Sequence, residues 1–208
     1  ILNCEGNHMS FPLPPIEVLE SCLIDPKKKP FKVLLPTSIN CIKNTSELLI
    51  NLVKELTIRD DIRRFTKLSN SIQETITSII LDNQEKTIRK VEEIIETEQN
   101  YIWTDDKVFL ENLQKMFSNM KYPLNIDSIR QILIEYFNSI KKIIQHSVPK
   151  FVMLFLIKNT ESNLQSNLYQ KIQKKDFIDM LCESPEIEKQ RESLNISLKK
   201  LISAKKIL

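Results

Sequence analysis

Apolar residues recur at spacings of three and four from residue 37 onward, which is the pattern of a helix with one buried face. One such stretch covers residues 37–57 and another covers residues 60–117. The apolar positions of the first stretch include Ile42, Leu49, Leu52, Val53 and Leu56. The second stretch opens with Asp60 and Asp61, which suit the positive end of a helix dipole, and it contains neither proline nor glycine. An unbroken helix over residues 60–117 would be roughly 85 Å long at about 1.5 Å per residue, so the pattern predicts a rod.

A second helical half follows a short break at residues 118–124, which include Tyr122 and Pro123. Apolar spacing resumes near residue 125 and continues beyond Pro149, so we expect this proline to kink a helix rather than end it. A last helix is expected over residues 185–207, with a proline in its first turn. Because the link at 118–124 is short, the two long helices must run antiparallel. The pattern therefore predicts an all-α protein, built as an elongated antiparallel helical bundle.

Residues 1–36 have a different character from the rest of the chain. Prolines stand at positions 12, 14, 15, 26, 30 and 36, and they prevent a long helix in this segment. A short helix fits only between residues 16 and 24. We therefore expect residues 1–36 to be an irregular, proline-rich segment that leads into the bundle.

Composition narrows the possible functions. Gly6 is the only glycine, which excludes the Gly-rich phosphate-binding loops and the nucleophile elbow, since each needs several glycines at fixed spacing. The net charge of +3, from 30 basic and 27 acidic residues, is too balanced to indicate a nucleic-acid partner. The four cysteines lack disulfide or zinc spacing and are expected to be reduced, and His8 and His146 stand alone, so no metal site is expected. No apolar run approaches the ~18 to 20 residues of a membrane-spanning helix.

Two clusters of residues are candidates for catalysis or binding. The glutamates of residues 92–98 could do acid–base work in a cleft, but a rod has no cleft, which favours an exposed helix face. Trp103, followed by Asp105 and Asp106, is interpreted as a packing anchor late in the long helix, with a binding role as the alternative. No catalytic set of serine, cysteine, histidine and aspartate can be assembled. We therefore expect no enzyme activity in this chain.

The stretch from residue 136 to residue 156 has the sequence YFNSIKKIIQHSVPKFVMLFL. It resembles the GTPase effector domain of dynamin-related proteins, in which a YFN start, a basic pair and SVPK-x-VM-x-FL occur in this order. The resemblance continues in LQSNL at residues 164–168 and in EIEKQR at residues 186–191. FTKL at residues 65–68 and ETEQNYI at residues 96–102 are similar to the start and the end of the family's long middle-domain helix.

This resemblance implies a stalk of a large, self-assembling GTPase that remodels membranes. Residues 37–117 would be the middle-domain stalk helices, 118–124 the tip loop and 125–208 the GTPase effector domain, entered through residues 1–36. We expect the chain to be a piece of a longer protein, whose GTPase head and first stalk helix precede it. GTP and magnesium would then bind in that head, and no cofactor is expected within these residues.

The resemblance also implies what the stalk does. It would form a homodimer and higher oligomers for membrane fission or remodelling, and it would stimulate GTP hydrolysis in the head. The protein would be cytoplasmic and bound peripherally to a membrane. The alternatives are a purely structural helical tether and a membrane-surface module, neither of which needs a GTPase parent.

Self-assembly residues follow from matching the motifs position by position. The dimer patch of relatives corresponds to Leu154, with Thr97 facing it from the other long helix. A second assembly patch corresponds to Ser166, Tyr169 and Ile172. Leu154 and Tyr169 also lie off the apolar stripe of their helix, which is where interface residues are found. In the tip loop, Lys121 and Tyr122 are expected to be exposed toward lipid or a target protein, with a simple connector as the alternative.

Overall fold

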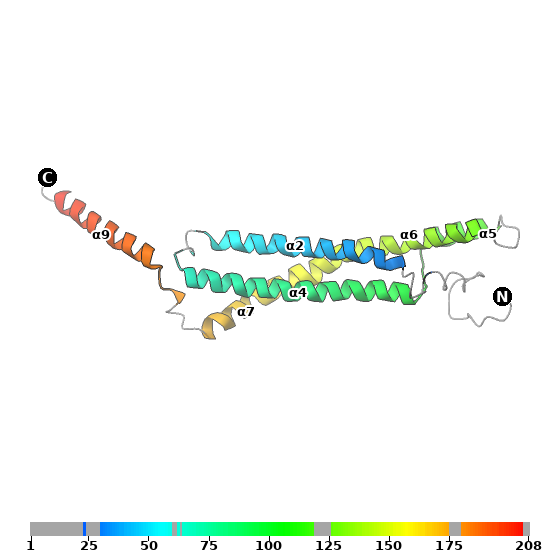
Figure 1. The fold of residues 1–208 in the computed structure, drawn as a ribbon, viewed down its shortest axis with the longest axis horizontal. Coiled ribbons are helices and arrows are strands. Elements are labelled where there is room, and N and C mark those ends of the chain that lie inside the picture. The colour runs from blue at the N-terminus through cyan, green and yellow to red at the C-terminus, as the bar shows by residue number, and fades with distance from the viewer. Residues whose placement is uncertain are drawn as a thin grey trace. The chain divides into compact units, whose positions relative to one another are not determined.

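A computed structural model of the chain describes residues 23, 30–59, 62, 64–118, 126–174 and 180–205. Every regular element in these ranges is a helix, so the predicted all-α class is confirmed there (Figure 1). The elements are η1 (Pro30–Val33), α2 (Leu34–Thr57), α4 (Thr66–Asn100), α5 (Lys107–Ser118), α6 (Ile126–Phe151), the π-helix η2 (Val152–Lys158), α7 (Asn159–Lys174) and α9 (Pro185–Lys205).

The chain divides into two compact units, and both are discontinuous in sequence. Unit 1 consists of residues 1–44 and 84–156, and unit 2 consists of residues 45–83 and 157–208. Helices α2 and α4 therefore each contribute one end to each unit.

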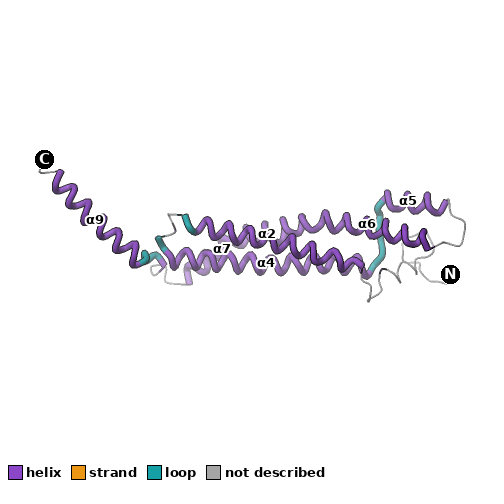
Figure 2. The backbone as a smooth tube through the Cα atoms, turned by 45° about the horizontal axis from the view of Figure 1, so that its top comes forward, coloured by secondary structure: helices purple, strands orange, loops and turns teal. Residues whose placement is uncertain are grey.

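Unit 1 has an aromatic core made by η1, α5 and α6. The ring of the buried Tyr136 meets Phe31 edge to face at 6.2 Å between centroids, and meets Phe109 at 5.7 Å. Phe31 also stacks on Phe137 at 5.6 Å. Helix α5 packs against α6 (Figure 2). Each such ring pair adds about 0.5–1.5 kcal/mol to the burial of its apolar area, so these rings fix the middle of α6 against η1 and α5.

Buried residues of unit 1 follow a four-residue repeat on two helices. On α6 the series is Ile132, Tyr136, Ile140, Ile144 and Val148. On α4 the series is Thr87, Val91, Ile95 and Gln99. Positions four residues apart form one ridge of a helix, and such ridges pack into the grooves of a neighbouring helix. The spacing therefore explains which face each helix buries.

The unbroken helix predicted for residues 60–117 is wrong, because α4 ends at Asn100 and α5 starts at Lys107. The Asp106 carboxylate caps α5: its Oδ1 accepts hydrogen bonds from the backbone N–H of Val108 at 3.0 Å and of Phe109 at 3.4 Å. The Thr104 hydroxyl in turn accepts one from the Asp106 N–H at 3.2 Å. Short polar side chains that satisfy the first N–H groups of a helix favour a start there, and this local preference interrupts the apolar pattern.

The helix boundaries near the N-terminus also differ from expectation. The 3-10 helix Pro30–Val33 and the start of α2 lie within the segment predicted to be irregular. Pro36 lies in the first turn of α2, where its missing N–H costs nothing. Of the short helix expected at residues 16–24, only Leu23 is described, and it is helical and buried. The start expected at Asp60 and Asp61 lies outside the described residues, and α4 begins at Thr66.

The helix continues past Pro149, as predicted, and a π-helix follows three residues after the proline. Helix α6 runs past this proline to Phe151 and is followed directly by the π-helix and then by α7. The predicted last helix is confirmed at its start, where Pro185 is the first residue of α9 and the Ser184 hydroxyl accepts a hydrogen bond from the Ile187 N–H at 3.4 Å.

Unit 2 is held by polar contacts between helices. The Ser69 hydroxyl on α4 donates to the Thr57 carbonyl at the end of α2 at 3.2 Å, and the Gln73 amide donates to the Thr57 hydroxyl. The buried Asn83 amide on α4 donates to the Thr160 hydroxyl on α7 at 3.0 Å. A buried amide must keep its partner, so these bonds set the register of α4 against α2 and α7.

Candidate self-assembly surface

The π-helix carries two consecutive exposed apolar side chains in unit 1. Met153 is 51% exposed and Leu154 is 50% exposed, whereas Val152 and Leu156 on either side of them are buried. Phe151 and Phe155 are half-buried, and their rings meet edge to face at 5.6 Å. The prediction that Leu154 lies off the core face is confirmed. Its role in self-assembly stays a prediction.

Thr97, which was expected to face Leu154, is exposed near the end of α4 in the same unit. Its hydroxyl donates to the Glu93 carbonyl one turn earlier at 2.7 Å. The side chain therefore has a local hydrogen bond already and offers mainly its methyl group to a partner.

The second predicted patch lies on α7 in unit 2. Ser166 and Tyr169 are both exposed and stand three residues apart, so they share one face of the helix. The Ser166 hydroxyl donates to the Asn163 carbonyl at 3.2 Å. Ile172 belongs to the same helix, but its side chain lies outside the described residues. Tyr169 is thus the largest described apolar group of this patch.

Lys121 and Tyr122 of the tip loop lie outside the described residues. The described residues on either side of this loop are Ser118 and Ile126. Helices α5 and α6 are joined further from the loop, where the buried Ser139 hydroxyl donates to Asp106 Oδ2 at 2.8 Å. This bond holds the pKa of the Asp106 carboxyl below its usual range, helped by the two backbone N–H groups of the cap. One aspartate therefore ties the start of α5 to α6, at the opposite end of α5 from the tip loop.

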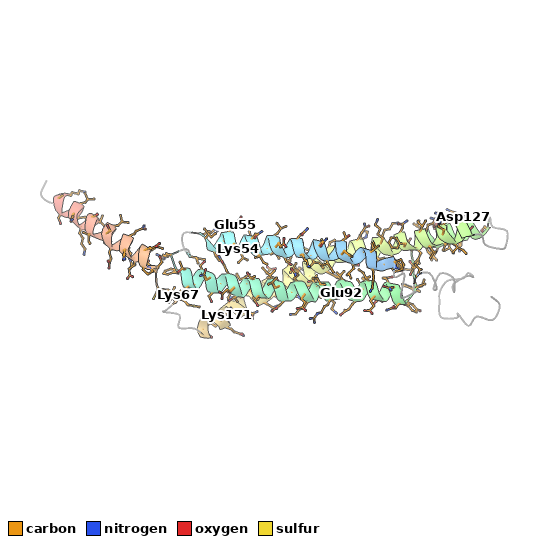
Figure 3. All side chains as sticks on the ribbon, viewed as in Figure 1. Lys54, Glu55, Lys67, Glu92, Asp127 and Lys171 are labelled. Atoms are coloured by element: carbon orange, nitrogen blue, oxygen red, sulfur yellow. The ribbon has the colours of Figure 1, made fainter. Side chains whose placement is uncertain are left out.

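The glutamate-rich stretch of α4 is an exposed face for most of its length, as interpreted from the sequence. Glu92 is exposed on the outer side of α4 (Figure 3), and Glu93 pairs with Lys90 at 2.6 Å. Glu98 differs, because partial burial raises the pKa of its carboxyl. Its charge is also a second cause, after burial, of the raised pKa of the Tyr136 phenol. The Glu98 carboxylate thus acts on the Tyr136 phenol through its charge.

The sequence suggested that Trp103 is a packing anchor within a long helix, and this interpretation is wrong. Trp103 lies in the link between α4 and α5 and is exposed, while its neighbour Ile102 is buried. The helix break explains the difference, because the residues of the link no longer follow the phase of α4.

An exposed leucine stripe on α2 was missed by sequence reasoning. Leu48, Leu52 and Leu56 are all exposed, although Leu52 and Leu56 were assigned to the core face. The stripe lies in unit 2 and follows one ridge of the helix at four-residue spacing. The apolar arc of α2 is wider than the surface that its described neighbours cover. A count of apolar positions around the whole helix could have found this.

Comparison with known proteins identifies the family of this helical chain. Residues 27–118 match the family described as Dynamin central region, and residues 121–208 match the family described as Dynamin GTPase effector domain. The chain belongs to the dynamin family. The two matches follow one another along nearly the whole chain, and they agree with the effector-domain motifs found in the sequence.

Individual dynamin relatives match over shorter stretches. The chain is 35% identical to Dynamin-A of Dictyostelium discoideum over 89 residues, which is 42% of this chain and 10% of that protein. It is 31% identical to Dynamin-related protein dnm1 of Schizosaccharomyces pombe over 86 residues, 41% of this chain and 11% of the relative. It is 36% identical to Dynamin-1-like protein of Mus musculus over 81 residues, 38% of this chain and 11% of the relative. The matched stretch thus spans about a tenth of each relative.

Among the described residues, this dynamin-family chain has no helix that is both long enough and apolar enough to cross a bilayer.

Proposed function

We propose that this chain is the stalk of a dynamin-related GTPase, which dimerises and oligomerises during membrane fission or remodelling and stimulates GTP hydrolysis in a head domain. The observation that carries the proposal is the presence of a dynamin central region and a GTPase effector domain in one helical chain. The head would hold GTP and magnesium. The protein would be cytoplasmic and associate with its membrane peripherally.

The exposed pair Met153 and Leu154 supports self-association as the first step. Two half-exposed apolar side chains side by side favour burial against a partner, since each Å² of apolar surface removed from water contributes about 25 cal/mol. Tyr169, 64% exposed in the other patch, supports a further contact. Weak contacts of this kind become strong when they are repeated along a polymer, because each one raises the effective concentration for the next.

The first test is Leu154→Asp in the 208-residue chain. A charge buried without a partner at a dimer contact costs roughly 3–5 kcal/mol, so the dissociation constant should rise by at least ~100-fold. Sedimentation equilibrium over a range of concentrations measures this. Leu194→Asp on α9 is the matched control, since it places the same charge on another exposed leucine.

Circular dichroism must show equal helix content in both variants for the comparison to count. A Leu154→Asp protein that dimerises as tightly as the Leu194→Asp control would remove the pair from the interface. If the unsubstituted chain sediments as a monomer throughout, the same comparison belongs in the longer protein that includes the first stalk helix.

The leucine stripe of α2 supports a second partner within the same protein. We assign Leu48, Leu52 and Leu56 to the contact with the first stalk helix, since they form a continuous apolar ridge that nothing described in unit 2 covers. Leu52→Asp should change the stability of the 208-residue chain by no more than about 0.5 kcal/mol. The same substitution should destabilise the longer protein by several kcal/mol, as measured by urea unfolding. Equal effects in both would contradict the assignment.

A further inference from the structure

The link between α4 and α5, drawn in teal in Figure 2, carries two exposed aromatic side chains. Tyr101 is 52% exposed and Trp103 is 44% exposed, whereas Ile102 and Thr104 are buried. This alternation is the pattern of an extended segment, in which successive side chains point to opposite sides. Tyr101, Trp103 and the exposed Asp105 therefore lie on the outer side of the link.

The link is fixed in place before any partner arrives. The Tyr101 N–H donates to the Thr97 carbonyl at 3.1 Å, and the Thr104 hydroxyl accepts a hydrogen bond from the Asp106 N–H at 3.2 Å. The buried side chain of Ile102 holds the segment between these two bonds. A segment that is already ordered loses little conformational entropy on binding, so its exposed rings are well placed to contact a partner.

Core packing does not explain the indole of Trp103. The buried positions of the link are filled by Ile102 and Thr104, and the tryptophan points the other way. The resemblance to the family's long middle-domain helix covers residues 96–102 and stops before Trp103. Tryptophan and tyrosine are also the residue types that contribute most binding energy at protein interfaces. The exposed indole is therefore better explained by binding than by the fold.

The sequence around these rings is acidic. Residues 91–106 contain no lysine or arginine and six acidic residues, which are Glu92, Glu93, Glu96, Glu98, Asp105 and Asp106. Lys90 offsets Glu93 through an ion pair at 2.6 Å, and the charge of Lys142 acts on Asp106. Asp105 is exposed two residues after the indole. A surface of this charge attracts a cationic partner and repels the anionic headgroups of a membrane leaflet.

We infer that Tyr101, Trp103 and Asp105 form a docking site for a basic segment of another protein. An arginine or lysine of that segment stacks on the aromatic rings, since a cation is attracted to the face of an indole or phenol ring. The Asp105 carboxylate accepts charge-assisted hydrogen bonds from the same segment. The site uses none of the side chains assigned to self-assembly, and it goes beyond the proposed stalk function.

Trp103 is the only tryptophan of the chain, so its fluorescence reports on this site directly. Acrylamide should quench that fluorescence readily in the unbound chain. The probe is a hexapeptide of alternating arginine and leucine, blocked at both ends. Titration with this peptide should shift the emission to shorter wavelength and reduce the quenching. The same peptide with glutamate in place of arginine should do neither.

Substitutions locate the binding. Asp105→Lys should raise the dissociation constant of the arginine peptide at least ~10-fold, and Tyr101→Ala should raise it at least ~3-fold. Glu192→Lys is the matched control, because it makes the same change of charge at an exposed position of α9 and should leave the constant unchanged. All three residues are exposed, so the thermal transition should not move and each variant remains comparable.

Three outcomes would overturn the inference. The first is an indole that acrylamide cannot reach in the unbound chain. The second is a peptide that leaves the fluorescence unchanged, or that binds the Asp105→Lys and Glu192→Lys variants equally well. The third is an emission shift with vesicles of phosphatidylcholine and phosphatidylserine but not with the arginine peptide, which would make the site a membrane contact instead.

Discussion

Asp106→Ala is the sharpest test of how the start of α5 is held against α6, because the Asp106 carboxylate makes three described contacts. It caps α5 through the N–H groups of Val108 and Phe109, and it accepts the hydroxyl of the buried Ser139 on α6. Loss of an N-cap costs about 0.5–2 kcal/mol, and leaving a buried hydroxyl without its partner costs about 1–3 kcal/mol. We therefore expect the free energy of unfolding at pH 7 to fall by roughly 2–4 kcal/mol.

Urea unfolding followed by circular dichroism measures that loss. Asp105→Ala is the matched control, because Asp105 is exposed and adjacent, and it should change stability by no more than about 0.5 kcal/mol. Asp106→Asn should retain most of the cap and lose less than alanine does. The double variant with Ser139→Ala should lose less than the sum of the two single variants.

The pH dependence of the same group gives a separate check. The folded-state pKa of Asp106 lies below its ordinary value of 3.8, so the folded state binds its proton less readily than the unfolded state. The contribution of the ionised Asp106 carboxylate to the free energy of unfolding is therefore complete above the ordinary pKa, and it is lost as the pH falls through the folded-state pKa. If Asp106→Ala proved as stable as Asp105→Ala at pH 7, the carboxylate would not join α5 to α6.

Three further predictions concern other parts of the chain. Asn83→Ala should cost about 1–3 kcal/mol in urea unfolding, because it removes the hydrogen bond that the buried Asn83 amide donates to the Thr160 hydroxyl; a change below about 0.5 kcal/mol would show that this bond does not fix the register. Glu98→Gln should raise the free energy of unfolding at pH 7 and have no effect well below pH 4.5, because burial raises the folded-state pKa of the Glu98 carboxyl and penalises its charged form. Equal effects at both pH values would contradict that cause. Tyr169→Asp should leave the dimer intact and stop larger assemblies in sedimentation velocity, and unchanged large assemblies would exclude Tyr169 from the second contact.

Helical periodicity was sufficient to predict the class of the fold and the main helices, because apolar spacing reports directly which side of a helix is buried. It failed at residues 101–106, where Thr104 and Asp106 form a cap. Such a local hydrogen-bonded start competes with the apolar pattern, and neither proline nor glycine marks it. The cap was visible as a Thr-x-Asp sequence, but it was interpreted as helix interior.

The faces of α2 show a different limit. Leu52 and Leu56 are apolar at helical spacing and were placed in the core, yet both are exposed. A single period cannot tell how many neighbours a helix has, so a wide apolar arc looks like one broad core face. The assignment of such residues depends on tertiary contacts that the sequence does not state locally.

The candidate surface was predictable in part. Leu154 and Tyr169 were placed outside the core because they lie off the apolar stripe, and both are exposed. Met153 was missed, because no residue type in the sequence marks the π-helix that contains it.

The interleaved composition of the two units has a consequence for how this chain folds. Each unit takes residues from the central region and from the effector domain, so a cut between residues 118 and 126 leaves neither unit whole on either piece. Residues far apart in the chain must meet before a core closes: Asn83 and Thr160 are 77 positions apart. Closing loops of this length costs entropy before any burial repays it, which makes contacts of high sequence separation slow to form. The two family-matched regions are thus not separate folding units, and each one depends on the other for its hydrophobic core.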